Sequence, residues 1–169
     1  NEDLAFQVGL DPFYTSLLSL NPYSQDALFL LGLNYQTIAE KELDKLLHLS
    51  SSNLRYPDVQ LRFKKYSRQS LAYYSQLINS QMYSPLKKVA TMQRARIWSL
   101  LGNYSSARSD LISLLDVPKN APQISSVNEL RFLQDIFELE YLTKSTVLME
   151  LGKLYFKNRD YEAASEAFN

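Results

Sequence analysis

The chain has 169 residues, with 18 Lys and Arg against 18 Asp and Glu, a single histidine and no cysteine. The absence of cysteine excludes thiolate catalysis, Cys-ligated zinc and disulfides, and zero net charge gives no long-range attraction to nucleic acid or anionic lipid. The apolar runs are far shorter than the roughly 20 residues of a membrane span, so we expect none.

Three predicted helix starts share the same two-residue pattern. Asp11-Pro12, Asn21-Pro22 and Ser84-Pro85 each place a capping side chain before a proline suited to the first helical position. They predict helices over residues 12–20, 22–33 and 85–101. Breaks at Asn34 and Gly102, residues that suit a left-handed helix end, then predict partner helices over 35–49 and 104–115.

The remaining elements are less regular. Pro57 opens a weaker helical pair, which we expect to break near Ser67. After a proline-containing loop over 117–122, residues 125–155 fit one long helix or two abutting helices, and we favour one long helix. The chain starts at Asn1 without a methionine and stops inside an apolar helix over 161–168, so we expect a fragment of a longer array.

The chain also repeats itself at an offset of 68 residues, which is twice 34. A period of 34 residues, with small residues where helices touch, is typical of the tetratricopeptide repeats that this chain resembles. The resemblance implies an all-α, tetratricopeptide-like solenoid of about four hairpins with one long helix, as a single domain over 1–169. The residues expected to pack the repeats are Ala27, Ala39, Leu43, Ala95, Trp98, Gly102, Ala107, Leu111, Gly152, Tyr155, Tyr161 and Ala164.

A second register competes at the front of the chain. It places Gly32 in the position that Gly152 occupies in the last repeat. We rank it lower because Asp44 would then fall where a small residue is needed.

The sequence offers no catalytic, cofactor or metal site, and we expect no enzyme and no small-molecule substrate. His48, the single histidine, cannot build a multi-histidine metal site or a histidine-paired nucleophile alone, and we interpret it as an ordinary helix residue. The scattered glycines form neither a phosphate loop nor a dinucleotide loop. The carboxylate-clamp positions of chaperone-binding repeats fall on Met149, Glu150 and Lys153, so a glutamate would face the anion and a co-chaperone is disfavoured.

Two basic stretches remain as interaction candidates. Arg62, Lys64, Lys65 and Arg68 form a possible interaction ridge on the middle pair, and a second basic stretch precedes Trp98. Three interpretations stay open: solvated faces over buried aromatics, a ridge that faces a protein, and a basic, aromatic track for RNA, which the zero net charge disfavours. We expect Trp98 to pack in the core.

The order of short motifs resembles the trafficking protein particle complex subunit 12 family. The matching stretches are Gln36, Ala39, Glu40, Glu42 and Leu43; then Asn53, Leu54, Pro57 and Asp58; then Pro85 and Leu101-Gly102-Asn103; and finally Asp160, Tyr161, Ala163, Ala164, Glu166, Ala167 and Phe168. This resemblance implies a non-catalytic subunit of a vesicle-tethering and Rab guanine-nucleotide-exchange complex in ER–Golgi traffic or autophagy. It also implies a cytoplasmic location, peripheral at ER–Golgi membranes.

The expected partners are therefore proteins: other subunits of the complex, or a peptide or helix in the concave groove. The alternative functions are a generic tetratricopeptide peptide-binding adaptor or co-chaperone and, less favoured, a helical-repeat RNA-binding protein.

Overall fold

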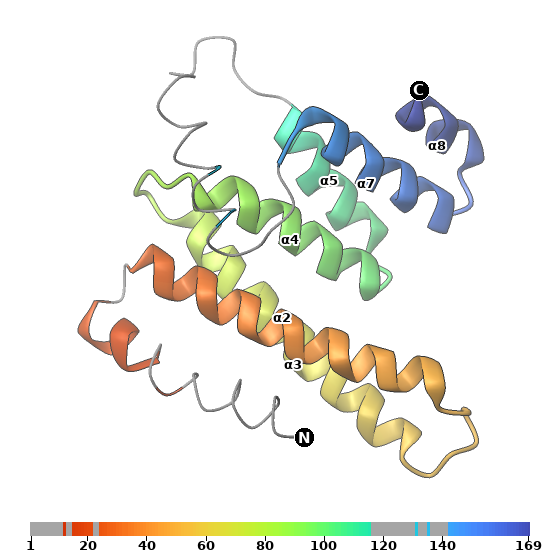
Figure 1. Ribbon diagram of the computed structural model, residues 1–169, viewed down its shortest axis with the longest axis horizontal. Coiled ribbons are helices and arrows are strands. Elements are labelled where there is room, and N and C mark those ends of the chain that lie inside the picture. Colours follow the sequence, from red (N-terminus) through yellow and green to blue (C-terminus); the bar gives the residue numbers. More distant parts are fainter. Residues whose placement is uncertain (1–11, 13–14, 22–23, 116–130, 132–134, 136–141) are drawn as a thin grey trace. The chain divides into compact units, whose positions relative to one another are not determined.

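A computed structural model describes residues 12, 15–21, 24–115, 131, 135 and 142–169 (Figure 1). Within these residues all regular structure is helical and there are no strands, which confirms the all-α class. The chain divides into two compact units, Asn1–Gln81 and Met82–Asn169. The continuous solenoid expected over 1–169 stays a prediction.

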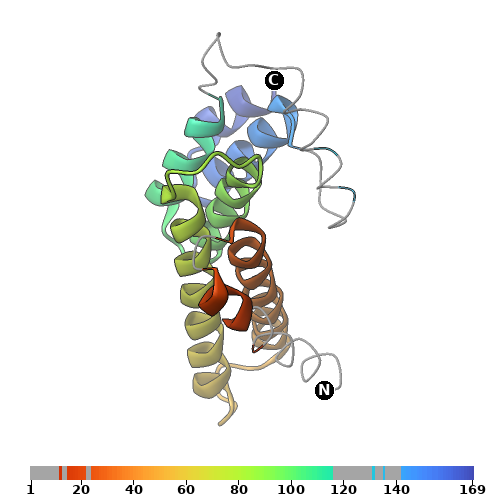
Figure 2. The same cartoon turned by 90° about the vertical axis from the view of Figure 1, so that its left-hand side faces the viewer.

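The first unit is built on two long antiparallel helices, α2 (Gln25–His48) and α3 (Tyr56–Asn79), which lie side by side in Figures 1 and 2. Residues 15–20 before them are also helical, in agreement with the predicted helix over 12–20. The Ser24 side chain caps α2 by accepting the Ala27 N–H, so the cap predicted at Asn21 is wrong. Pro57 lies in the first turn of α3, as expected.

Two predicted helix breaks are wrong, because α2 runs through Asn34 and α3 runs through Ser67 without interruption. An asparagine inside a helix costs at most about 0.7 kcal/mol relative to alanine. A break would cost far more, because buried side chains such as Phe29 and Ile38 flank Asn34 on both sides and pack along the whole length of α2. Tertiary packing therefore overrides the local signal.

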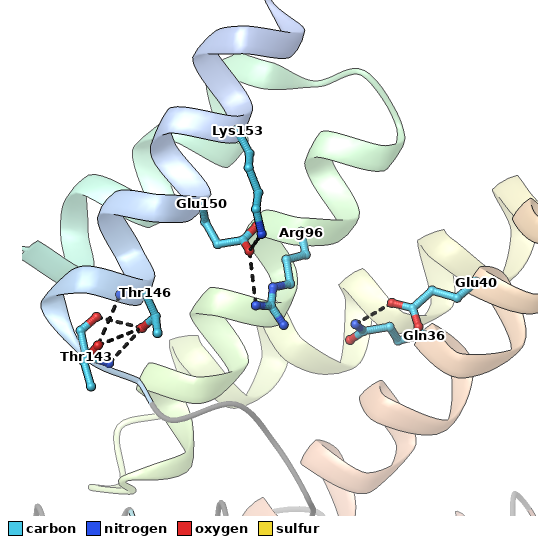
Figure 3. Close-up of polar contacts among 7 residues, drawn as sticks. All are labelled: Gln36, Glu40, Arg96, Thr143, Thr146, Glu150 and Lys153. Carbon is cyan, nitrogen blue, oxygen red and sulfur yellow. Dashed lines mark hydrogen bonds and ion pairs between the residues drawn. The ribbon is translucent and has the colours of Figure 1, made fainter. Parts of the chain in front are cut away.

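Small residues bring α2 and α3 close together. A Cβ atom added to Gly32 would lie 2.5 Å from the ring of Tyr74, which is fully buried. The Ser70 hydroxyl donates to the Gly32 carbonyl at 2.6 Å, and the Tyr74 hydroxyl donates to Gln36 Oε1 at 2.9 Å. Gln36 in turn donates to Glu40 at 2.9 Å (Figure 3). Gly32 thus lies at a close contact between α2 and α3, where its neighbour is the Tyr74 ring.

The described residues of the second unit form two helical hairpins. The first is α4 (Leu86–Leu100) with α5 (Tyr104–Leu115), and the second is α7 (Lys144–Lys157) with α8 (Tyr161–Phe168). The observed bounds of α4 and α5 agree with the predicted 85–101 and 104–115 to within one residue, inside the usual uncertainty of helix ends. Helix α5 packs against α7, and α4 also touches α7. One apolar cluster joins the hairpins: Met92, Ala95, Ala107, Leu111, Val147, Leu151 and Leu154.

Both hairpins turn in the same way. After α4, Gly102 has φ 77° and the Asn103 N–H bonds the Trp98 carbonyl. After α7, Arg159 has φ 62° and the Asp160 N–H bonds the Tyr155 carbonyl. In each case the αL residue ends one helix by a Schellman motif, and the next side chain caps the following helix. This shared geometry relates the two hairpins residue by residue at an offset of 57.

The single long helix favoured over 125–155 is wrong. Thr143 is extended, with φ −116° and ψ 165°, and its side chain accepts the Thr146 N–H, so a new helix begins at Lys144 (Figure 3). Most of residues 116–141, which include the predicted loop over 117–122, lie outside the described residues.

Candidate interaction face

The first helices of the two hairpins, α4 and α7, bring three charged side chains together. Arg96 Nη2 of α4 donates to the Glu150 carboxylate of α7 at 3.3 Å, and Lys153 Nζ donates to the same oxygen at 3.1 Å (Figure 3). The Glu150 side chain is 17% exposed and that of Lys153 is 56% exposed. Glu150 therefore holds both cations on the hairpin face, partly accessible to solvent.

A hollow of about 40 Å³ lies beside this cluster, lined in part by Ser99, Leu154 and Lys157. Small-molecule sites usually enclose about 300–1,000 Å³, so this hollow cannot enclose a metabolite. It can accept a single side chain of a partner. The face formed by Arg96, Ser99, Glu150, Lys153 and Lys157 is called the α4–α7 face below.

A larger hollow of about 420 Å³ lies at the turn end of the hairpins. Its residues include Asn103, Arg108 and Tyr155, and Arg108 Nε donates to the Tyr155 hydroxyl at 3.1 Å. The Arg108 guanidinium also lies 5.8 Å from the centre of the Tyr155 ring, in cation–π geometry. These contacts tie α5 to α7, and among the described residues that line the hollow no nucleophile lies beside a base.

A second arginine, Arg94, stabilises the packing of α4 against α5. Arg94 forms a two-pronged ion pair with Asp110 of α5, with nitrogen–oxygen distances of 2.8 and 2.7 Å. Both side chains are largely buried, at 17% and 11% exposure. Arg94 therefore links the two helices of its hairpin through a fork geometry that lysine could not reproduce.

The four residues of the predicted interaction ridge do not share one environment. Arg62 Nε donates to the buried Glu42 carboxylate at 2.9 Å, and Lys45 bonds the same group. Burial by itself would raise the pKa of Glu42, but the two cations outweigh it and hold the pKa below its usual range. Lys64, Lys65 and Arg68 instead lie exposed on α3. Arg62 is therefore held by an ion pair within the first unit, although its side chain is 46% exposed, and the exposed Lys64, Lys65 and Arg68 form the rest of the ridge.

The residues expected to pack the repeats lie in the following environments. Ala27, Ala39, Ala95, Ala107, Leu111, Gly152 and Ala164 are buried, Leu43, Trp98 and Tyr155 are partly buried, and Gly102 and Tyr161 are exposed. Trp98 packs against the apolar cluster of the second unit. Tyr161 meets Phe156 edge-on, with ring centres 5.5 Å apart.

Sequence reasoning missed the pairing of Arg96 with Glu150, which are 54 positions apart, and the role of Glu42. The sequence shows the offset of 57 between Ala107 and Ala164, but this offset does not align Arg96 with Glu150, so the pair depends on how α4 packs against α7. Glu42 could have been suspected, since it falls on the apolar stripe of its own helix.

His48 is exposed and lies 3.5 Å from the Asp44 carboxylate. Among the described residues no group of three or more His, Cys, Asp or Glu side chains could hold a metal ion. Within that same part of the chain, no helix is both long and apolar enough to cross a bilayer.

Comparisons of the chain with protein families, with curated proteins and with solved structures found no match.

Proposed function

We propose that this chain is a non-catalytic scaffold that binds a protein partner through the α4–α7 face. The observation that supports the proposal is the stacking of two hairpins with the same turn, which brings Arg96, Glu150 and Lys153 together on neighbouring first helices. Stacked hairpins present such faces to peptides or helices in repeat proteins. A side chain in the small hollow and polar contacts around it would give a partly wet, specific interface.

The charges on this face favour a partner with both polar and apolar groups. Glu150 already neutralises part of the charge of Arg96 and Lys153, so a bare carboxylate would have to compete with it. A chaperone-tail clamp is therefore disfavoured. The resemblance to the trafficking protein particle complex subunit 12 family gives the finer proposal, in which the partners are other subunits of a vesicle-tethering complex at ER–Golgi membranes. A transient peptide adaptor is the alternative.

Affinity purification of the full-length protein from its own cells tests this proposal. The variants Ser99→Trp and Lys153→Glu should each lose the stoichiometric partners of the unmodified protein, because the first fills the hollow and the second places two carboxylates side by side. Lys144→Glu, an exposed change in the first turn of α7, is the matched control and should retain them. Retention of every partner by both test variants would refute the assignment of this face.

A further inference from the structure

The charge of the chain is strongly uneven although its total is zero. Residues 41–68 contain seven Lys and Arg against three Asp and Glu, a net charge of +4, so the rest of the chain is correspondingly acidic. Part of this positive charge, in Lys45 and Arg62, is bound to Glu42. The remainder includes Arg55, Lys64, Lys65 and Arg68, all of which are exposed.

Exposed leucines accompany these cations. Leu54, in the turn before α3, is 96% exposed, and Leu61, in the second turn of α3, is 68% exposed. On α3, Leu61, Lys64, Lys65 and Arg68 are three, four and seven positions apart, which places them on one side of the helix. The opposite side carries the buried residues that pack on α2, among them Phe63 and Ser67. Leu54, Arg55, Leu61, Lys64, Lys65 and Arg68 are called the α3 basic face.

We propose that the α3 basic face docks on a membrane surface that contains anionic lipids. Lys and Arg beside an anionic bilayer are each attracted by about 1 kcal/mol, which is roughly a five-fold gain in partitioning per cation. Apolar side chains between the cations can enter the headgroup region, while the long basic side chains reach the lipid phosphates. Attraction of the cations to anionic lipid and burial of the apolar leucine side chains are the two terms that set the strength of binding at a membrane interface.

The same residues fit RNA less well. Single-stranded nucleic acid is held by aromatic rings that stack on bases, together with cations. Tyr66, which follows Lys65 in the sequence, is already stacked on Tyr35, with ring centres 6.1 Å apart, and the Lys65 ammonium lies 5.7 Å from the centre of the Tyr66 ring. Leucine offers bases no stacking surface. The α3 basic face therefore favours lipid over RNA.

Vesicle flotation of the 169-residue chain tests the proposal. We expect binding to phosphatidylcholine vesicles that contain about one third phosphatidylserine, no binding to phosphatidylcholine alone, and weakening when salt is raised from about 0.1 to about 0.5 M. The triple variant Lys64→Glu/Lys65→Glu/Arg68→Glu should lower the partition coefficient at least a hundred-fold. Its control, Lys88→Glu/Arg131→Glu/Lys144→Glu, makes the same charge change at exposed residues of the second unit and should stay within a few-fold of the unmodified chain.

The leucines are tested separately. Leu54→Ser/Leu61→Ser should lower partitioning at least ten-fold at unchanged net charge, whereas Leu20→Ser, at a residue that is 84% exposed outside the face, should not. Circular dichroism of each variant should be unchanged, since the altered side chains are exposed. Absence of binding to the anionic vesicles, equal binding by the triple variant, or binding of single-stranded RNA without any vesicle binding would each overturn the proposal.

Discussion

A Cβ atom added to Gly32 or to Gly152 would overlap an aromatic ring, and we predict different effects on stability when each glycine is replaced by alanine. A Cβ atom at Gly32 would lie 2.5 Å from the Tyr74 ring, and one at Gly152 would lie 2.3 Å from the Phe168 ring. Both glycines lie inside helices, where replacement by alanine gains about 1 kcal/mol of helix propensity. The outcome therefore depends on whether the ring can move.

Tyr74 cannot move without loss. It is 0% exposed and its hydroxyl is held by Gln36, so Gly32→Ala must overpack the seam, at about 1–3 kcal/mol, and weaken a buried hydrogen bond, at about 1 kcal/mol. We expect Gly32→Ala to destabilise the protein by about 1–3 kcal/mol in total. Phe168 is 50% exposed at the end of α8, so its ring can turn outward into solvent. For Gly152→Ala we expect a change between zero and a gain of about 1 kcal/mol.

Urea unfolding followed by far-UV circular dichroism measures both free energies on the same chain. The reasoning would be refuted if Gly32→Ala were neutral or stabilising, or if Gly152→Ala cost as much as Gly32→Ala. Gly32→Ala combined with Tyr74→Leu provides the internal check, because removal of the ring should recover most of the loss caused by the methyl group.

Three further predictions concern single interactions. Arg159→Gly should stabilise the protein by about 0.5–1 kcal/mol because glycine adopts φ 62° without strain, whereas Gly102→Ala should destabilise it by about 1 kcal/mol. Thermal unfolding measures both changes. If both variants were stabilised, or both destabilised, the assignment of matching turns would be contradicted. Arg94→Met should cost about 3–5 kcal/mol in urea unfolding because it leaves Asp110 unpaired, and Asp110→Asn in the same background should recover part of that loss. Folding lowers the pKa of Glu42, so the ion pairs of Glu42 contribute their full stability above the ordinary pKa of 4.5 and lose it as the pH falls through the folded pKa. In the Glu42→Gln variant the free energy of unfolding should therefore fall less steeply as the pH is lowered through this range. An unchanged pH dependence in that variant would contradict the ion pairs.

The second unit could be predicted closely because its signals are local. Pro85, Gly102 and Asn103 mark the ends of α4 and α5 by backbone chemistry that needs no distant partner, and the structure places these ends within one residue of the prediction. The recurrence of a similar turn at Arg159 was hidden, since arginine is rarely found in the left-handed conformation.

The first unit was harder because its decisive contacts are distant in sequence. Asn34 and Ser67 look like helix ends, but each belongs to a 24-residue helix whose length is set by packing against the other. The partner of Gly32 lies 42 positions away in Tyr74, beyond the reach of a 34-residue repeat. In the same way, no periodicity in the sequence joins Arg96 of α4 to Glu150 of α7, so the sequence did not predict the α4–α7 face.

Chemical cross-linking of the native assembly, purified through the full-length protein, tests the scaffold assignment most directly. If a protein partner lies on the α4–α7 face, Lys153 and Lys157 should form cross-links to a stoichiometric partner, and these should disappear in the Ser99→Trp variant. Recovery of the protein without a stoichiometric partner, or cross-links confined to residues away from α4 and α7, would contradict the account.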